Sequence, residues 1–137
     1  ENSVWHYLCA AKIVGAEKAR SALIPIQQDE RVIMMDIYGL YRGTKKPEEV
    51  LAAAHAGNPK PEDLKVQLFY TYLYLALYFD ANGETSRARE FINLSLPVAD
   101  QRNPMGDVAR IHARLMTDKS LPAPATSVPG PLEKKDK

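Results

Sequence analysis

The chain has 137 residues, 45% of them hydrophobic and 26% charged, which predicts one modest core in a single domain. Its 18 basic and 17 acidic residues give a net charge of +1, too weak a field to draw the molecule to nucleic acid. The sequence has no apolar run of about 20 residues to span a bilayer, and its single cysteine excludes an internal disulfide and a cysteine-rich zinc site.

Hydrophobic spacing, cap residues and prolines predict an all-α fold of about seven helices, with no credible strand pair. In chain order the predicted helices cover about residues 3–15, 16–26, 32–41, 47–57, 61–81, 85–99 and 104–116, and Pro25 bends or ends the far side of the second. The clearest start signal lies at residues 58–63, where a cap residue and two prolines precede Glu62 and Asp63. These acids fall at the positive end of the helix dipole, so this segment opens the longest predicted helix.

The composition changes after Asp118, where four prolines stand among small residues and a charged end follows. Such a segment has too little apolar surface to offset the entropy lost on ordering. We therefore expect a helical domain over residues 1–117 and a disordered tail over residues 118–137. The alternative for the tail is a proline-rich ligand for another module. Because the chain begins at Glu1 rather than Met, we expect a fragment or a processed form.

The helix predicted over residues 61–81 is apolar on both faces. The faces carry Tyr72, Leu75, Ala76 and Phe79 on one side, and Tyr70, Leu73, Tyr74, Leu77 and Tyr78 on the other. A helix at the surface of a globular protein shows one apolar stripe, so neighbouring helices or a ligand must cover this one from both sides. The small residues Ala76 and Ala88 permit close approach of the next helix, which indicates an antiparallel helical hairpin.

Nine positions in this predicted hairpin follow one pattern: Tyr72, Leu75, Ala76, Phe79, Gly83, Ala88, Ile92, Ser95 and Leu96. In type and spacing they resemble one tetratricopeptide repeat, a helix-turn-helix unit of about 34 residues. The pattern departs at Ile92, where the family has a second aromatic residue, and at Asp100, where a proline usually follows. The resemblance implies stacked antiparallel hairpins in an α–α superhelix, here as part of a longer array. It also implies a non-catalytic adaptor that binds another protein.

The order of elements over residues 4–116 further resembles the later part of the NlpI type of bacterial envelope lipoprotein. The resemblance includes Trp5 near the start and a Leu68, Phe69, Tyr70 entry into the aromatic helix. It implies a scaffold in the periplasm or at the outer membrane for proteases or cell-wall hydrolases; without it the expected compartment is the cytoplasm. The lipid-bearing cysteine and the earlier repeats of that type are not in this sequence. A second class of function stays open, which is a helical docking subdomain of a larger enzyme or secretion machine.

Candidate catalytic and metal-ligating residues do not form a pattern. His6, His55 and His112 fall on separate predicted helices, and none has a second ligand at a metal-binding spacing such as HExxH. Cys9 occupies a small-residue position, where we expect it to pack as a small apolar side chain. The sequence therefore predicts no enzyme, no cofactor and no metal.

The tetratricopeptide resemblance implies where a partner binds. The residues between the signature positions on the first helix line a concave surface in that family; here these are Tyr70, Leu73, Tyr74, Leu77 and Asp80. Arg110 and Arg114, one turn apart on the last helix, add a charged rim. The expected partner is another protein or a peptide segment, and a homo-oligomer stays open. The alternative is that earlier helices, above all residues 32–41, cover this face completely.

Overall fold

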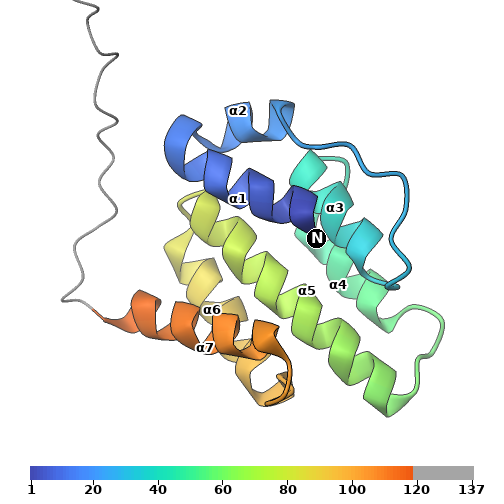
Figure 1. Ribbon diagram of the computed structural model, residues 1–137. Coiled ribbons are helices and arrows are strands. Elements are labelled where there is room, and N and C mark those ends of the chain that lie inside the picture. The colour runs from blue at the N-terminus through green and yellow to red at the C-terminus, as the bar shows by residue number, and fades with distance from the viewer. Residues whose placement is uncertain (119–137) are drawn as a thin grey trace, which may run out of the picture.

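A computed structural model describes residues 1–118 of the chain. Within this range the chain forms seven α-helices, one short 3₁₀ helix and no strand, which confirms the predicted all-α fold (Figure 1). The elements are α1 (Asn2–Val14), α2 (Ala16–Ser21), α3 (Met34–Arg42), α4 (Pro47–His55), α5 (Pro61–Ala81), α6 (Thr85–Ser95), η1 (Leu96–Val98) and α7 (Pro104–Thr117). The predicted tail lies, apart from Asp118, outside the described residues.

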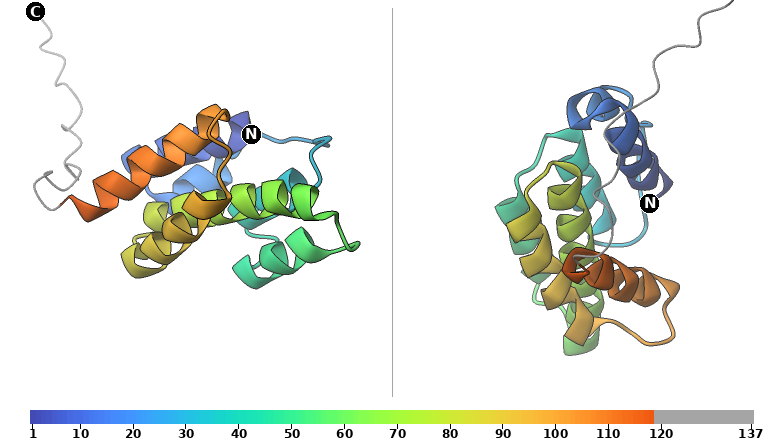
Figure 2. Two further views of the ribbon diagram at one scale, coloured as in Figure 1. Left: turned by 90° about the horizontal axis from the view of Figure 1, so that it is seen from below. Right: turned by 90° about the vertical axis from the view of Figure 1, so that its left-hand side faces the viewer.

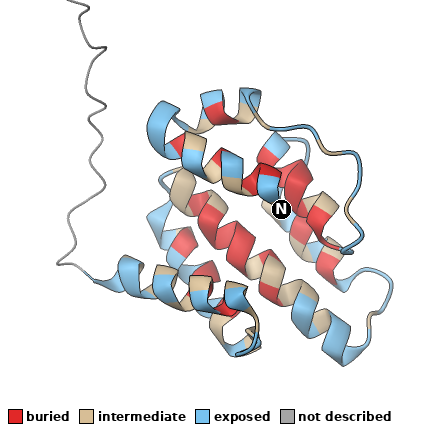
Figure 3. Cartoon of the chain, in the orientation of Figure 1, coloured by how far each residue is buried: buried red, intermediate tan, exposed pale blue. Residues whose placement is uncertain are grey.

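α5 is the central helix, and it contacts α1, α3, α4, α6 and η1. Figure 2 shows α1 and α7 on one side of α5, with α4 and α6 on the other. The buried residues of α5 belong to both of its apolar faces, among them Leu73 and Tyr74 on one and Leu75 and Ala76 on the other. The expectation that both faces of this helix are covered is therefore confirmed, and Figure 3 shows the buried stretch along the middle of α5.

α5 and α6 form a tight helical hairpin. Gly83 turns the chain with a φ of 80°, and the Glu84 N–H donates to the Phe79 carbonyl at 2.8 Å. Ala76 and Ala88 are fully buried, and this allows the two helices to approach closely. The Phe91 ring of α6 stacks on Phe79 with a centroid distance of 5.5 Å. The two alanines thus lie in the interface that the sequence predicts for them.

The segment between α2 and α3 differs from the prediction. α2 ends at Ser21 instead of continuing to residue 26, and α3 begins at Met34 instead of Val32. Pro25 has no backbone N–H and stands between two β-branched residues, so a helix cannot continue through it. The segment is instead held by tertiary contacts: the Ser3 hydroxyl donates to the Ile24 carbonyl at 2.6 Å.

The register of α1 also differs from the prediction. Cys9, expected to pack as a small apolar side chain, is exposed. The buried face carries Val4, Tyr7 and Ala11 instead. The Tyr7 ring packs edge-on against Tyr41 of α3 with a centroid distance of 5.0 Å, and this contact turns the opposite face, with Cys9, toward solvent.

Candidate binding surface

Three residues of the predicted partner groove are buried. Leu73 and Tyr74 are 0% exposed and Leu77 is 6% exposed. The Tyr41 hydroxyl of α3 donates to the Tyr74 carbonyl at 2.8 Å, and the Trp5 ring of α1 packs edge-on against the Tyr74 ring. The middle of α5 is thus covered by α1 and α3, and these three side chains are part of the core rather than of an open groove.

A network of charged groups fixes the chain segment that borders this region. Arg31 donates to the Glu1 carboxylate at 2.8 Å and to the Asp29 carboxylate at 2.7 Å, while the Tyr74 hydroxyl donates to Glu1. The hydrogen bond from Arg31 lowers the pKa of Asp29 to about 2. Burial opposes ionisation of Glu1, but the hydrogen bonds from Tyr74 and Arg31 hold its pKa below the usual value. Residues 29–31 are therefore held against the start of α1.

The fixed segment and the start of α5 enclose a hollow of about 430 Å³. We call it the loop hollow, and its lining residues are Glu30, Arg31, Val32, Ile33, Pro59, Asp63, Val66, Gln67 and Tyr70. Val32 is 69% exposed and Val66 is 54% exposed, so apolar surface is accessible here. Tyr70, the half-buried member of the predicted groove, forms part of this wall.

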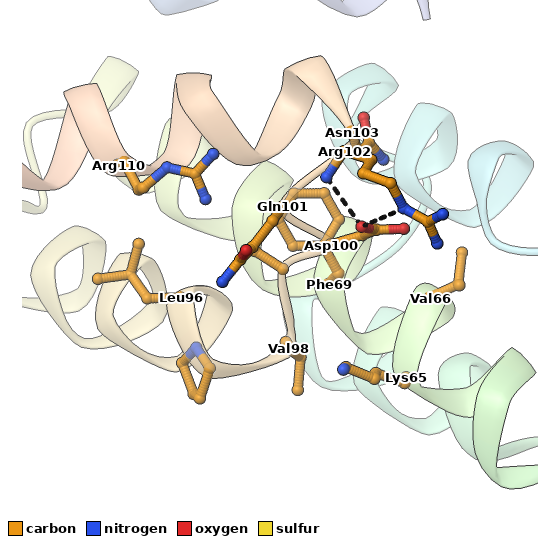
Figure 4. Close-up of a pocket in the computed structure, with 12 residues that line it drawn as sticks. Lys65, Val66, Phe69, Leu96, Val98, Asp100, Gln101, Arg102, Asn103 and Arg110 are labelled. Atoms are coloured by element: carbon orange, nitrogen blue, oxygen red, sulfur yellow. Dashed lines mark hydrogen bonds and ion pairs between the residues drawn. The ribbon is translucent and has the colours of Figure 1, made fainter.

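A larger hollow of about 730 Å³ lies beside η1, on the other flank of Val66 (Figure 4). We call it the η1 hollow, and its lining residues are Lys65, Val66, Phe69, Leu96, Pro97, Val98, Ala99, Asp100, Gln101, Arg102, Asn103 and Arg110. Asn103 also donates through Nδ2 to the Tyr70 hydroxyl at 3.1 Å. The two hollows are therefore adjacent, and Val66 and the Tyr70–Asn103 contact lie between them.

The sequence around η1 explains why this hollow forms. Pro97 lacks an N–H, and α6 gives way there to a single turn of 3₁₀ helix. Asn103 begins α7 by accepting the Met105 N–H at 3.0 Å. Gly106 allows the connecting loop to lie close to α7, because a Cβ atom at this position would stand 2.7 Å from the Asp100 carbonyl oxygen. The loop is thus fixed at both ends.

The charges of the η1 hollow are predominantly basic. Arg110 donates to Asp107 at 2.6 Å, and the Arg102 Nε atom lies 3.8 Å from Asp100. Within residues 1–118, Lys65 has no ion-pair partner. The loop hollow has the opposite character, because Arg31 is already paired with Glu1 and Asp29, whereas Glu30 and Asp63 have no ion pair among the described residues.

The structure separates the remaining predicted residues. Arg110 lines the η1 hollow, whereas Asp80 lies at the far end of α5 and pairs with Lys12 of α1 at 3.4 Å. His112 of α7 reaches the same carboxylate, with its Nε2 atom 3.8 Å away. Arg114 is exposed near the end of α7, away from both hollows. Asp80 therefore pairs α5 with α1, and Tyr70 and Arg110 are the members of the predicted set that line the loop hollow and the η1 hollow.

Sequence reasoning missed Val66, Lys65 and Arg102. One signal was available for the η1 hollow, since an isolated glycine inside a helical pattern weakens the helix and so points to a packing reason, which at Gly106 is the close approach of the Asp100 carbonyl. No comparable signal exists for the loop hollow, because its wall over residues 30–33 reaches α5 only through the tertiary fold.

Neither a metal site nor a membrane-spanning helix is found in the part of the chain that the structure describes. In residues 1–118 no three or more His, Cys, Asp or Glu side chains gather so that they could hold a metal ion. None of the described helices combines the length and apolar character needed to cross a bilayer.

Comparison of the chain with protein-family models, with curated proteins and with solved structures finds no match.

Proposed function

We propose that this protein is a non-catalytic adaptor of the tetratricopeptide type, which binds a peptide segment of another protein on the first turns of α5. The observation that carries the proposal is the pair of adjacent hollows on either flank of the exposed Val66. Both volumes fall within the range of about 300 to 1,000 Å³ that is typical of ligand pockets. Following the resemblance to the NlpI type of lipoprotein, we propose that this adaptor acts in the bacterial cell envelope.

The accessible side chains suit protein recognition. Val66 and Val32 present aliphatic surface next to Tyr70, whose ring offers a large contact area with few rotatable bonds. Aromatic and aliphatic groups in hollows bordered by charged residues form the energetic centre of many protein interfaces. This arrangement supports binding of a side chain from a partner on each flank of Val66.

Packing and hydrogen bonds hold the elements around this surface in place. α5 is packed from Phe69 to Phe79, and the bordering loops are held by the Arg31 network and by Asn103. A preorganised surface loses little conformational entropy on binding, which favours affinity. The packing of Ala76 against α6 supports the tetratricopeptide part of the proposal, because a hairpin of this kind is the unit of that repeat.

Selection from a random peptide library, with the full chain as bait, tests the proposal. The tightest selected peptide is titrated by fluorescence anisotropy against the wild-type chain and against Val66→Asp. The control is Ile13→Asp on α1, because Ile13 is 65% exposed and lines neither hollow.

We expect Val66→Asp to weaken binding by about tenfold or more, as for a central interface residue. Ile13→Asp should bind as the wild type does, and both variants should retain the wild-type circular dichroism spectrum. Selection of no peptide, or equal affinity for wild type and Val66→Asp, would contradict the proposal.

A further inference from the structure

The two hollows beside Val66 differ in electrostatic character. The η1 hollow has an apolar floor that includes Phe69, Leu96 and Val98, and its charged rim is mainly basic. Figure 4 shows Arg110 at one end of this hollow and Arg102 and Lys65 toward the other, with Phe69 and Val98 between them. An occupant therefore needs an apolar side chain for the floor and negative charge for the rim.

The basic groups of the η1 hollow are free enough to bind a carboxylate. Lys65 has no ion-pair partner within residues 1–118. The side chain of Arg102 is 93% exposed, and its 3.8 Å pair with Asp100 is of the solvent-screened kind that contributes little. The Asp100 carboxylate also accepts a hydrogen bond from the Arg102 backbone N–H at 2.9 Å, and this bond does not involve the Arg102 side chain. A carboxylate from a partner can therefore bind the Lys65 and Arg102 side chains while this loop contact stays in place.

The loop hollow, on the other flank of Val66, carries a surplus of negative charge. Arg31 is held by Glu1 and Asp29, which neutralise it. Glu30 and Asp63 have no ion pair within the described range. A ligand that places acidic groups in the η1 hollow therefore gains from a basic group here, and a second acid is repelled.

We propose that the occupant is a partner peptide segment with an acidic side chain for the η1 hollow, an aliphatic side chain over Val66 and a basic side chain for the loop hollow. This inference rests on the proposed function, because it assigns the chemistry of the peptide that the adaptor binds. The opposite charges also fix the direction in which the segment lies, since the reversed orientation brings like charges together at both hollows.

Nucleic acid is a poorer match for the same surface. A phosphate backbone needs basic groups along its whole path. Here the carboxylates of Glu30 and Asp63 line the loop hollow, across Val66 from Lys65, and repel phosphate. The charge order across Val66 thus favours a peptide whose charge changes sign along its length.

A charge-reversal experiment on the full chain tests the inference. The probes are the tightest peptide from the random library and a derivative of it in which every acid is replaced by Lys and every base by Glu. The variants are Lys65→Glu with Arg102→Glu in the η1 hollow, and Glu30→Lys with Asp63→Asn in the loop hollow. The control pair, Lys18→Glu with Arg89→Glu, reverses two exposed charges that line neither hollow.

We expect the selected peptides to carry both charges, and the η1-hollow variant to bind the original peptide about tenfold or more weakly. This variant should prefer the charge-reversed derivative, whereas the control pair should behave as the wild type. The loop-hollow variant should bind the original peptide more weakly than the wild type does, because Glu30→Lys repels its basic side chain. Binding to the wild type should weaken between about 50 mM and about 500 mM salt, because ions screen exposed charges.

Three results would overturn the inference. In the first, the selected peptides lose affinity for Val66→Asp but bind the wild type and the η1-hollow variant with equal affinity; the charge assignment is then wrong and the proposed function stands. Selection of no peptide would remove both. A single-stranded oligonucleotide that binds the wild type, loses binding on Lys65→Glu with Arg102→Glu, and competes with the peptide would assign the surface to nucleic acid.

Discussion

Tyr70 and Tyr74 show how neighbouring residues on one helix face can have different roles. They are one turn apart on α5, and their rings stack with a centroid distance of 6.4 Å. Tyr74 is fully buried under α1 and α3, and burial raises the pKa of its hydroxyl, which donates to Glu1. Tyr70 lies beyond that cover and lines the loop hollow. The boundary between the core and the proposed binding surface therefore falls between two consecutive turns.

His112 makes the stability of the fold dependent on pH. Burial lowers its pKa below 6.5; Asp80 opposes this shift and Lys12 adds to it. Among the described residues, its Nε2 atom has no hydrogen-bond partner. The unfolded chain binds a proton at this histidine at higher pH than the folded chain does, so folding stability is fully present above pH 6.5 and is lost as the pH falls through the lowered pKa.

We therefore expect the free energy of unfolding in urea to fall between about pH 7.5 and about pH 5.5, and His112→Gln to reduce this dependence. His55→Gln, at an exposed position on α4, controls for the loss of one histidine and should retain the wild-type slope. An identical slope for wild type and His112→Gln would show that protonation of His112 is not linked to folding.

At the scale of elements, the joint between η1 and α7 depends on Gly106. Its missing Cβ is what allows Asp100 to lie against the helix. Replacing glycine by alanine inside a helix normally gains about 0.5 to 1 kcal/mol. Here the added methyl group would stand 2.7 Å from a backbone oxygen, so the loop or the helix must move.

We expect Gly106→Ala to lower the free energy of unfolding by about 1 to 3 kcal/mol, as for an overpacked site. It should also weaken peptide binding, because Asp100 and Arg102 shift with the loop. Gly39→Ala is the matched control, since a Cβ there would meet the flexible Lys45 side chain at 3.1 Å. Equal stability changes for the two variants, measured by urea denaturation, would show that the close approach at Gly106 is not important.

The elements that could be predicted are those with a local signal. Pro61 and Pro104 start α5 and α7 at the expected positions, and Gly83 makes the expected turn. The apolar spacing of Leu23 and Ile26 predicts a helix that Pro25 bends or ends, but the helix stops earlier, at Ser21, and a contact with α1 holds the following stretch as a loop.

The candidate surface was only partly predictable, for a geometric reason. A helical wheel assigns Leu73 and Tyr74 to one face of α5. It gives no information about α1 and α3, which cover that face through contacts distant in the sequence. The exposure of Cys9 has the same origin, since the contact of Tyr7 with Tyr41 sets the rotation of α1. Which residues are buried on a helix that is apolar on both faces thus depends on elements distant in the sequence.

At the scale of the whole molecule, all seven helices share one hydrophobic core. The cluster includes Val4 of α1, Ala19 of α2, Val50 of α4 and Ala109 of α7, and it is continuous through α5. A single contiguous core in a chain of this size favours unfolding as one cooperative unit. Units that stack only on their neighbours can instead unfold in steps.

Trp5 reports on this cooperativity, because it is the single tryptophan and it packs against Tyr74. We expect the urea transition followed by Trp5 fluorescence to coincide with the one followed by far-ultraviolet circular dichroism. A fluorescence transition at clearly lower urea would instead show that α1 detaches before the remaining helices unfold.

α5 is buried in its middle and exposed in its first turns, and this difference sets which of its residues can change during evolution. From Phe69 to Phe79 most side chains of this helix are committed to the core, whereas the first turns, including Lys65 and Val66, are exposed. Under the proposed function, substitutions in the first turns alter recognition at little cost to folding, while substitutions in the middle are constrained by neighbours on both sides. On that proposal, descendants of this chain can acquire new partners through a few surface changes at one end of a helix whose remaining turns stay fixed in the core.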